Sequence, residues 1–236
     1  VTGEADGPPL RPGVSLGDSV AGIFTALAIV SALYHRELTG KGQYIDISML
    51  DCQVALMENA FARYFATGTV PVRMGSRHPA ASPFQAFSTA DNHIVVALLT
   101  DDPGAWQRFC RAIDQPTLAN DARFLNNRSR MENHHVLEPV LARVFKEQST
   151  RTWVKRLEVE SIPCSPVMSI DEVAVDPQVA HRGMVTEVPH GSLGTWKVAN
   201  SPFKFSAVQT GAQGPSPNLG EHTEAVLQEW LGSEVH

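Results

Sequence analysis

The sequence contains few cysteines, charged residues or aromatic residues. Its 236 residues include three cysteines, and charged and aromatic side chains account for 19% and 7%. Cys52, Cys110 and Cys164 are widely separated, with no CxxC pair and no neighbouring histidine pattern. The sequence therefore predicts neither a disulfide framework nor a zinc or other metal site, and it is typical of a protein from a reducing cytoplasm.

Long apolar runs and basic stretches are also missing. The longest apolar run, residues 20–33, is followed directly by His35, Arg36 and Glu37. It is shorter than the roughly 20 residues of a membrane span, so it predicts a core helix and no membrane association. The net charge of −6 disfavours a surface for nucleic acid or anionic lipid. The sequence does not open on a secretory signal, so we expect a cytoplasmic location.

A phosphate-binding loop is missing as well. The stretch LTGKGQ resembles one, but His35 stands where the first glycine is needed and Gly42 where Ser or Thr is needed. We therefore interpret LTGKGQ as a helix end followed by a tight turn.

The residues that are present predict a mixed α/β protein of one large domain or two modest ones, since 43% of the side chains are apolar. A helix capped by Asp18 or Ser19 is expected to run to about Leu38 and to end at Gly40. Its apolar residues lie nearly all round it, which indicates packing on several sides. A strand at 43–50 and a helix at 50–66 follow, as in an α/β layer.

The composition then shifts to Gly, Pro, Ser and Arg over residues 68–83, which is typical of a linker or mobile loop. A hairpin of FQAFST and HIVVALLT is expected next. The later elements predicted are helices at 103–113, 130–146 and 150–159, an extended piece at 162–169, a short helix in SIDEVAVDPQV, strands at 184–188 and 195–199, and a final helix. The predicted domains are 1–70, part of a large α/β domain; 71–185, a linker and small α+β domain; and 186–236, a return to the large domain.

Several polar residues invite a functional interpretation. His134 and His135 are adjacent, so on a helix they cannot share one metal ion, and we expect a solvated helix face. Asp101 and Asp102 before Pro103 are typical of a helix cap.

Asp18 and His78 have two interpretations each. Asp18 is either a cap alone or an ionised carboxylate that attacks activated carbonyl groups, because a helix start favours the anion. His78 lies in a loop that is either an ordinary exposed loop or a lid over a ligand.

Five stretches together resemble the family III CoA-transferases: GVSLGDSVAGIFTALAIVSALYHRELTGKGQYIDISMLD, GSRHPAASPFQAFSTADNHIVVAL, SIPCSPV, DPQVAHRGM and LGEHTEAVL. The resemblance implies a Rossmann-like large domain with a smaller α+β domain, in an interlocked homodimer. It also implies that Asp18 is a nucleophile that moves CoA from an acyl-CoA to a carboxylic acid acceptor, through an aspartyl-acyl anhydride and an aspartyl-CoA thioester. CoA is then a substrate, with no tightly bound cofactor.

The resemblance extends to substrate contacts and has limits. Met49 matches a position near CoA, and Gly75 and His78 lie in MGSRHPAAS, which we interpret as a lid over the acyl end. The glycine-rich loop of formyl-CoA transferases is absent, which disfavours formyl-CoA and oxalate as substrates. The family's N-terminal Rossmann-like segment is also unmatched, so the sequence resembles the later portion of such an enzyme. A separate N-terminal chain or segment is then a further expected partner.

Two alternatives stay open at this point. The related α-methylacyl-CoA racemases also have an aspartate at the position of Asp18, but they use a glutamate after the strand that matches HIVVALLT. Thr100, Asp101 and Asp102 stand there instead, which favours a transferase. The other alternative is an inactive fragment or subunit of a CoA-transferase, because a nucleophile without its CoA pocket gains little from proximity.

Overall fold

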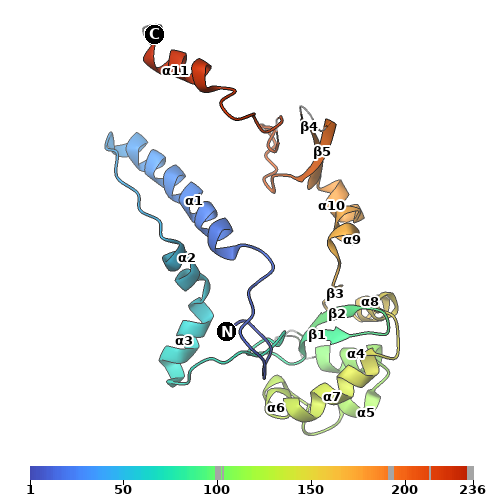
Figure 1. Cartoon of the computed structure of the whole chain (residues 1–236). Helices are drawn as coiled ribbons and strands as arrows, with labels where there is room; N and C mark the ends of the chain where they lie inside the picture. The colour runs from blue at the N-terminus through green and yellow to red at the C-terminus, as the bar shows by residue number, and fades with distance from the viewer. Residues whose placement is uncertain (99–101, 103, 191–193, 213, 233–236) are drawn as a thin grey trace. The chain divides into compact units, whose positions relative to one another are not determined.

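The computed structural model describes residues 1–236 except 99–101, 103, 191–193, 213 and 233–236. Its contacts divide the chain into two compact units, Val1–Val167 and Met168–His236, and each is described by itself (Figure 1). The predicted domain boundaries near residues 70 and 185 stay predictions. The first unit contains the helical segment α1–α3 and a module with its own core, residues 82–167, which we call the core module.

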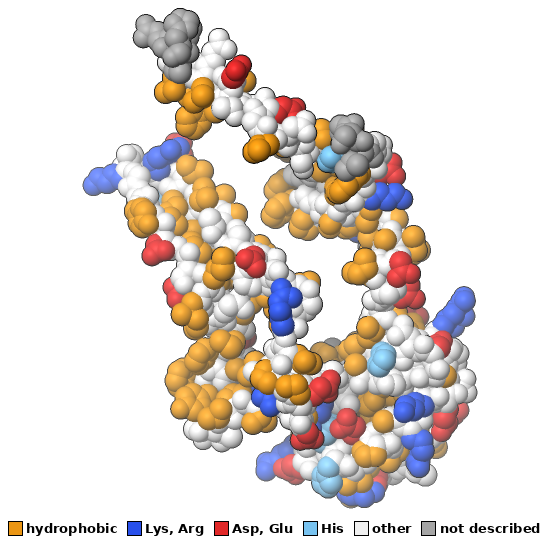
Figure 2. All heavy atoms as spheres, viewed as in Figure 1, with side chains coloured by type: hydrophobic (Ala, Val, Ile, Leu, Met, Phe, Trp, Pro, Cys, Tyr) orange, Lys and Arg blue, Asp and Glu red, His pale blue; other side chains and the backbone are white. Residues whose placement is uncertain are grey.

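The helical segment consists of α1 (Leu16–Thr39), α2 (Met49–Leu56) and α3 (Glu58–Thr67). Helix α1 ends at Gly40, whose φ of 70° gives the left-handed turn expected there. Its packing differs from the prediction, because α1 contacts α2 but none of its residues is buried. Figure 2 shows apolar side chains exposed over this segment.

Two further predictions for this segment are wrong. Residues 41–48 form no strand, since within the described residues no neighbouring strand pairs with them. A strand needs such a partner for its backbone groups, whatever its side-chain alternation. The helix expected over residues 50–66 is two helices, separated at Met57.

Helix α1 also bears on the membrane prediction. At 24 residues it is long and apolar enough to span a bilayer by length and composition, and it is the only such helix found among the described residues. The core helices of water-soluble proteins meet the same criteria, so this finding does not overturn the prediction of no membrane association.

The core module begins with the predicted hairpin. Strands β1 (Phe84–Ser88) and β2 (His93–Ala97) are antiparallel, and β3 (Cys164–Pro166), the extended piece, adds to the other edge of β2. Alternation places Ile94 and Val96 on the buried face of the central strand. The helices of the module are α4 (Ala105–Ala112), α5 (Pro116–Ala119), α6 (Asn127–Glu132), α7 (His134–Phe145) and α8 (Thr150–Val159).

These helices supply the other side of one hydrophobic core. Rings of Trp106, Phe109, Phe145 and Trp153 pack around it, and the Phe145 and Trp153 centroids are 5.2 Å apart. The other buried apolar members are Phe87, Ile94, Val96, Leu98, Ala105, Cys110, Ala112, Ile113, Phe124, Leu137, Leu141, Val144, Leu157 and Ile162.

The prediction of a solvated face for His134 and His135 is wrong for His134. Its side chain is buried, and its Nε2 lies 2.5 Å from a carboxylate oxygen of Glu138. Burial lowers the pKa of His134. The sequence missed this because α7 presents only one of two adjacent residues to the core.

The second unit contains α9 (Ile170–Ala174), α10 (Pro177–His181), β4 (Val185–His190), β5 (Gly194–Ala199) and α11 (Thr223–Leu231). The strands β4 and β5 lie where strands were predicted at 184–188 and 195–199, and they pair antiparallel, with Val185 opposite Ala199. The rings of His190 and Trp196 stack across it with centroids 5.0 Å apart.

Candidate active site

Asp18 lies in the first turn of α1, as its third helical residue. The predicted cap at Asp18 or Ser19 is wrong, because Ser15 occupies the N-cap position. The Ser15 side chain makes no capping bond, and its hydroxyl instead accepts a hydrogen bond of 3.2 Å from the Arg11 guanidinium. Asp18 is therefore an exposed carboxylate in a helix turn whose N–H groups are not satisfied by a side-chain cap.

The start of a helix attracts negative charge. The first turn carries partial positive charge, and three residues before Asp18 the Arg11 guanidinium bonds the Ser15 hydroxyl. The positive end of the helix can stabilise an oxyanion that forms beside Asp18. The turn can thus support a carboxylate that attacks a carbonyl carbon.

Met49, the predicted CoA contact, is the first residue of α2 and not the end of a strand. The Ser48 hydroxyl caps this helix by accepting from the N–H of Leu50 at 3.1 Å and of Asp51 at 3.4 Å. The Met49 side chain is 58% exposed, so it is available for contact. An apolar core role for Met49 is not what the structure shows.

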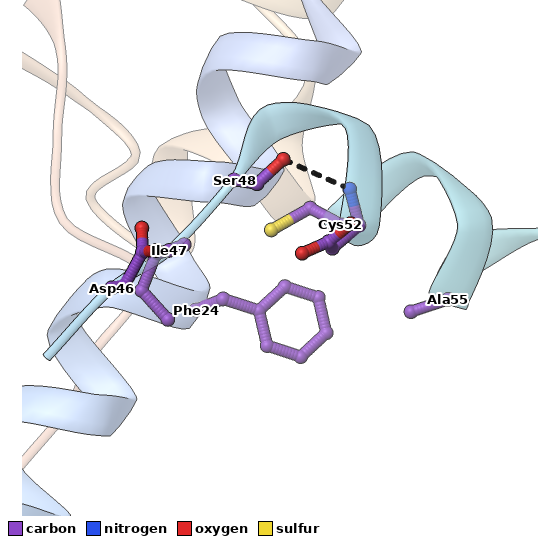
Figure 3. Close-up of a pocket in the computed structure, with 7 residues that line it drawn as sticks. Phe24, Asp46, Ile47, Ser48, Cys52 and Ala55 are labelled. Atoms are coloured by element: carbon purple, nitrogen blue, oxygen red, sulfur yellow. Dashed lines mark hydrogen bonds between the residues drawn. The ribbon is translucent and has the colours of Figure 1, made fainter.

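A pocket of about 200 Å³ lies between α1 and the first turns of α2. Figure 3 shows the Phe24 ring of α1 directed toward the start of α2, where Ser48 and the buried Cys52 lie. The carboxylates of Asp46 and Asp51 also line it, so its charge opposes an anionic CoA ester or carboxylic acid. Its full lining is Phe24, Asp46, Ile47, Ser48, Asp51, Cys52 and Ala55.

Gly75 and His78 lie in the segment that joins α3 to β1. The Gly75 N–H donates to the Gly3 carbonyl at 3.1 Å, and its φ of 62° suits glycine. The N–H of His78 donates to the Phe84 carbonyl at 2.8 Å, and the His78 ring stacks on the Phe84 ring with centroids 4.7 Å apart. His78 is exposed. The lid motion stays a prediction, and any closure must carry these contacts with it or break them.

Asn127 and Arg130 hold this loop, although no sequence pattern singles them out. The Asn127 amide bonds the backbone of Ala80 and Ser82, and the Arg130 Nε donates to the Ser82 carbonyl at 2.6 Å. Arg130 is 4% exposed, and burial lowers its pKa to about 10. A pattern search fails here because the partners are backbone groups 45 to 48 residues away.

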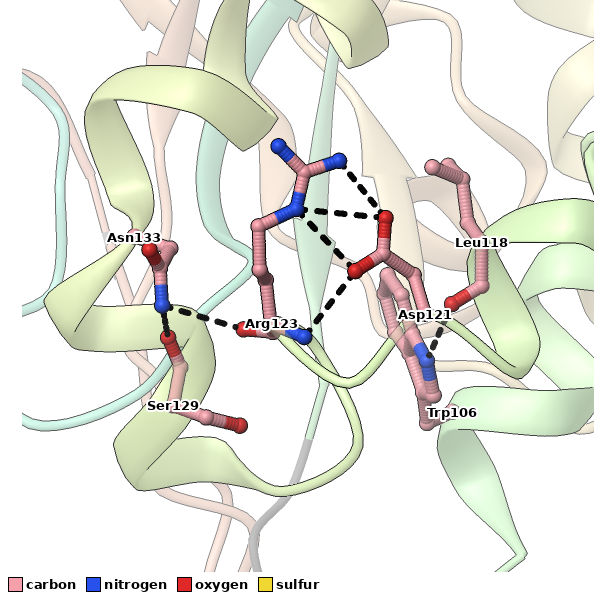
Figure 4. A network of polar contacts seen from close by, with 6 residues as sticks. All are labelled: Trp106, Leu118, Asp121, Arg123, Ser129 and Asn133. Carbon is pink, nitrogen blue, oxygen red and sulfur yellow. Dashed lines mark hydrogen bonds and ion pairs between the residues drawn. The ribbon is translucent and has the colours of Figure 1, made fainter.

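A polar network fixes the segment that carries α6, as Figure 4 shows. The Arg123 side chain pairs with Asp121 at 2.7 Å, and the Asn133 amide donates to the carbonyls of Arg123 and Ser129 at 3.3 and 2.9 Å. The indole N–H of Trp106 donates to the Leu118 carbonyl at 3.2 Å. Helix α6 is thus presented to the loop from a rigid base.

The residues behind the racemase alternative are only partly described. Thr100 and Asp101 lie outside the described residues. Asp102 accepts a hydrogen bond from the Gly104 N–H at 3.1 Å and pairs with Arg108, which lowers its pKa. The predicted cap is wrong for Asp102, because Gly104 is the N-cap of α4 and no side chain caps it, while Asp102 bonds the N–H of Gly104.

The structure gathers the four predicted site residues only in part. Gly75 and His78 share one loop, while Asp18 and Met49 begin two contacting helices. Within the described residues, no hydrogen bond or ion pair joins Asp18 to any of the other three.

Comparison with known proteins places the chain in a family. The model of CoA-transferase family III matches residues 1–223. A succinyl-CoA:glutarate CoA-transferase from Mus musculus is 34% identical over 98% of the chain and 52% of its own length. An acetyl-CoA:oxalate CoA-transferase from Acetobacter aceti is 35% identical over 99% of the chain and 59% of its own length. The chain belongs to CoA-transferase family III, as the sequence resemblance predicted.

The solved structures agree on the fold. The crystal structure of a CAIB/BAIF family protein from Brucella suis superposes with a TM-score of 0.79 at 32% identity, over 97% of this chain and 59% of that one. The mixed helix and strand arrangement is therefore that of the family. The chain spans between half and three fifths of the length of these relatives.

Proposed function

We propose that the protein containing this chain transfers CoA between carboxylic acids, with Asp18 as the covalent nucleophile. The observation that carries the proposal is the place of Asp18, exposed in the first turn of α1 where an anion is favoured. Membership of the family supports the proposal. Its relatives are named as succinyl-CoA:mesaconate, succinyl-CoA:glutarate and acetyl-CoA:oxalate CoA-transferases. We infer a short-chain dicarboxylic acid as one substrate.

The reaction is a sequence of balanced acyl exchanges. An Asp18 oxygen attacks the thioester carbon, the C–S bond breaks, and CoA leaves as a thiolate while an aspartyl-acyl anhydride forms. The thiolate then attacks the Asp18 carbonyl carbon, releases the donor acid as a carboxylate and leaves an aspartyl-CoA thioester. The acceptor carboxylate takes CoA by the same two steps in reverse, which restores Asp18.

The remaining residues of the proposed site bind substrate. Met49, Gly75 and His78 contact the CoA ester, and the loop of residues 75–83 shields the intermediates. Shielding matters because water would hydrolyse both the anhydride and the thioester. The cytoplasmic location and the homodimer remain part of this proposal.

The test is covalent trapping in the intact protein with succinyl-CoA as the donor and glutarate as the acceptor. After incubation with succinyl-CoA and hydroxylamine, mass spectrometry is expected to find a hydroxamate on the peptide that carries Asp18. Asp18→Asn should abolish both the adduct and transfer, because an amide supplies no attacking anion. Asp18→Ala should do the same with a stability change below about 1 kcal/mol, since Asp18 is not the cap and contributes only its helix-dipole term.

Glu58 offers a matched control. It is also exposed and also an acidic residue in the first turn of its helix, α3. Glu58→Gln should retain transfer and the Asp18 adduct. Transfer that survives in Asp18→Asn would return Asp18 to a structural role, and epimerisation of a 2-methylacyl-CoA without any adduct would favour the racemase. Complete inactivity of the intact wild-type protein toward both substrates would favour the inactive subunit.

A further inference from the structure

Two side chains of α6, Asn127 and Arg130, bind the loop backbone, and Asn127 does so with both ends of its amide. The Asn127 Nδ2 donates to the Ala80 carbonyl at 2.8 Å, and its Oδ1 accepts from the Ser82 N–H at 3.0 Å. Asn126, and not Asn127, caps α6 by accepting from the Ser129 N–H. The Asn127 amide is therefore free of a capping role and serves the loop.

Ala80 connects this clamp to His78. The Ala80 carbonyl is held by Asn127, while the Ala80 N–H donates to the Nδ1 of His78 at 3.2 Å. A ring nitrogen that accepts a hydrogen bond carries no proton, so a neutral His78 has its proton on Nε2. The Phe84 ring, stacked at an interplanar angle of 9°, fixes the plane of the imidazole.

The result is an exposed N–H donor on a fixed ring. Nδ1 is engaged with the loop itself, so Nε2 is the atom left for an external partner. An acyl-CoA offers acceptors that fit this donor, among them the oxygens of its thioester, amides and phosphates. A second hydrogen bond, from Arg130 Nε to the Ser82 carbonyl, also holds the loop. It keeps the Ser82 end of the loop in place when Asn127 is changed.

We propose that Asn127 is a positioning residue that orients His78, through Ala80, as an Nε2–H donor to an oxygen of the bound acyl-CoA. This inference rests on the proposed CoA transfer. It adds to that proposal the atom that binds the acyl-CoA, His78 Nε2, and the residue that orients the His78 ring, Asn127. Asn127 itself does not touch substrate.

The experiment is a double-mutant cycle in the intact protein with succinyl-CoA and glutarate. His78→Ala and Asn127→Ala should each raise the KM for succinyl-CoA about tenfold, the effect of one lost hydrogen bond, with kcat changed by less than about threefold. Combining them should add nothing, because Asn127 acts through His78. Asn127→Asp keeps the acceptor for Ser82 but loses the donor to Ala80, so it should resemble Asn127→Ala.

Asn120, an exposed asparagine just after α5, supplies the control. Asn120→Ala should leave KM and kcat unchanged. Hydrogen exchange adds a readout that does not need activity: the amides of Ala80 and Ser82 should lose protection in Asn127→Ala and keep it in Asn120→Ala.

The outcomes separate the two proposals. Multiplicative effects of His78→Ala and Asn127→Ala, or a wild-type KM in either, overturn the positioning role while the Asp18 adduct keeps the CoA-transfer proposal intact. Absence of the Asp18 adduct with normal succinyl-CoA binding overturns the transfer mechanism. The double-mutant cycle is then measured as the dissociation constant of succinyl-CoA in place of its KM. Unchanged amide protection in Asn127→Ala overturns the positioning role whether or not the protein is active.

Discussion

Trp153 provides the sharpest test of how the core module is held together. Its side chain is 2% exposed, and its indole N–H donates to the Phe145 carbonyl at 2.7 Å. Phe145 is the last residue of α7, where carbonyls lack a partner within the helix. The indole of α8 therefore satisfies the end of α7 and fills the core at the same time.

Replacing Trp153 by Phe removes the donor and shortens the ring. Leaving the buried Phe145 carbonyl without its partner costs about 1–3 kcal/mol. The smaller ring leaves a cavity worth about 1 kcal/mol more. We expect Trp153→Phe to lower the free energy of unfolding of the core module by about 2–4 kcal/mol.

Hydrogen exchange measures this loss within the module alone. The amides of Ala97 and Leu98 donate to the carbonyls of Pro163 and Pro83, so their exchange reports opening of the sheet. Trp230→Phe is the control, because Trp230 is 80% exposed in α11 and should change protection by less than about 0.5 kcal/mol. A loss below about 1 kcal/mol in Trp153→Phe would refute the reasoning.

Two further predictions concern charge and thiol chemistry. The Arg123 guanidinium lowers the pKa of Asp121 from 3.8 to about 2. The stability from this pair is therefore present above pH 4 and is lost as the pH falls toward 2. Acid titration of unfolding should show this loss of stability, and Asp121→Asn should remove the contribution of the pair. A slope between pH 4 and 2 that is the same in both proteins would contradict it. Burial raises the pKa of the Cys110 thiol to about 12. An alkylating reagent should therefore leave Cys110 unmodified in the native protein, which peptide mass spectrometry measures. Rapid labelling of Cys110 at pH 7 would contradict its burial.

Local patterns predicted part of the core module, although the helix expected over 130–146 is two helices, α6 and α7, separated at Asn133. The hairpin of β1 and β2 and the helix that Ser149 caps follow from strand alternation and a capping serine, both of which depend on neighbouring residues. The same is true of the turn at Gly40. The strand expected at 43–50 was wrong because alternation states which side chains share a face and says nothing about a pairing strand.

For the candidate site as well, local sequence signals were readable and contacts between distant residues were not. Asp18 was singled out because its position at a helix start and its match to the family are both local in sequence, and its catalytic role stays a prediction. The predicted cap was wrong by three or four residues, since Ser15, Asp18 and Ser19 are all acceptable residues at a helix start. Asn127 and its hold on Ala80 were not predictable, because an asparagine in NNRSR gives no sign of a contact 47 residues away.

The core cluster is drawn from one uninterrupted stretch of chain, from Phe87 to Ile162. A contiguous block of this kind can fold as a unit before the following chain is synthesised. It also needs only two crossover points in a gene to be exchanged between relatives. Because Asn127 lies inside the block and holds Ala80 just ahead of it, an exchange that includes the loop transfers His78 together with the residue that orients it. Recombination between relatives can therefore exchange the loop and its clamp together while leaving the helix of Asp18 untouched.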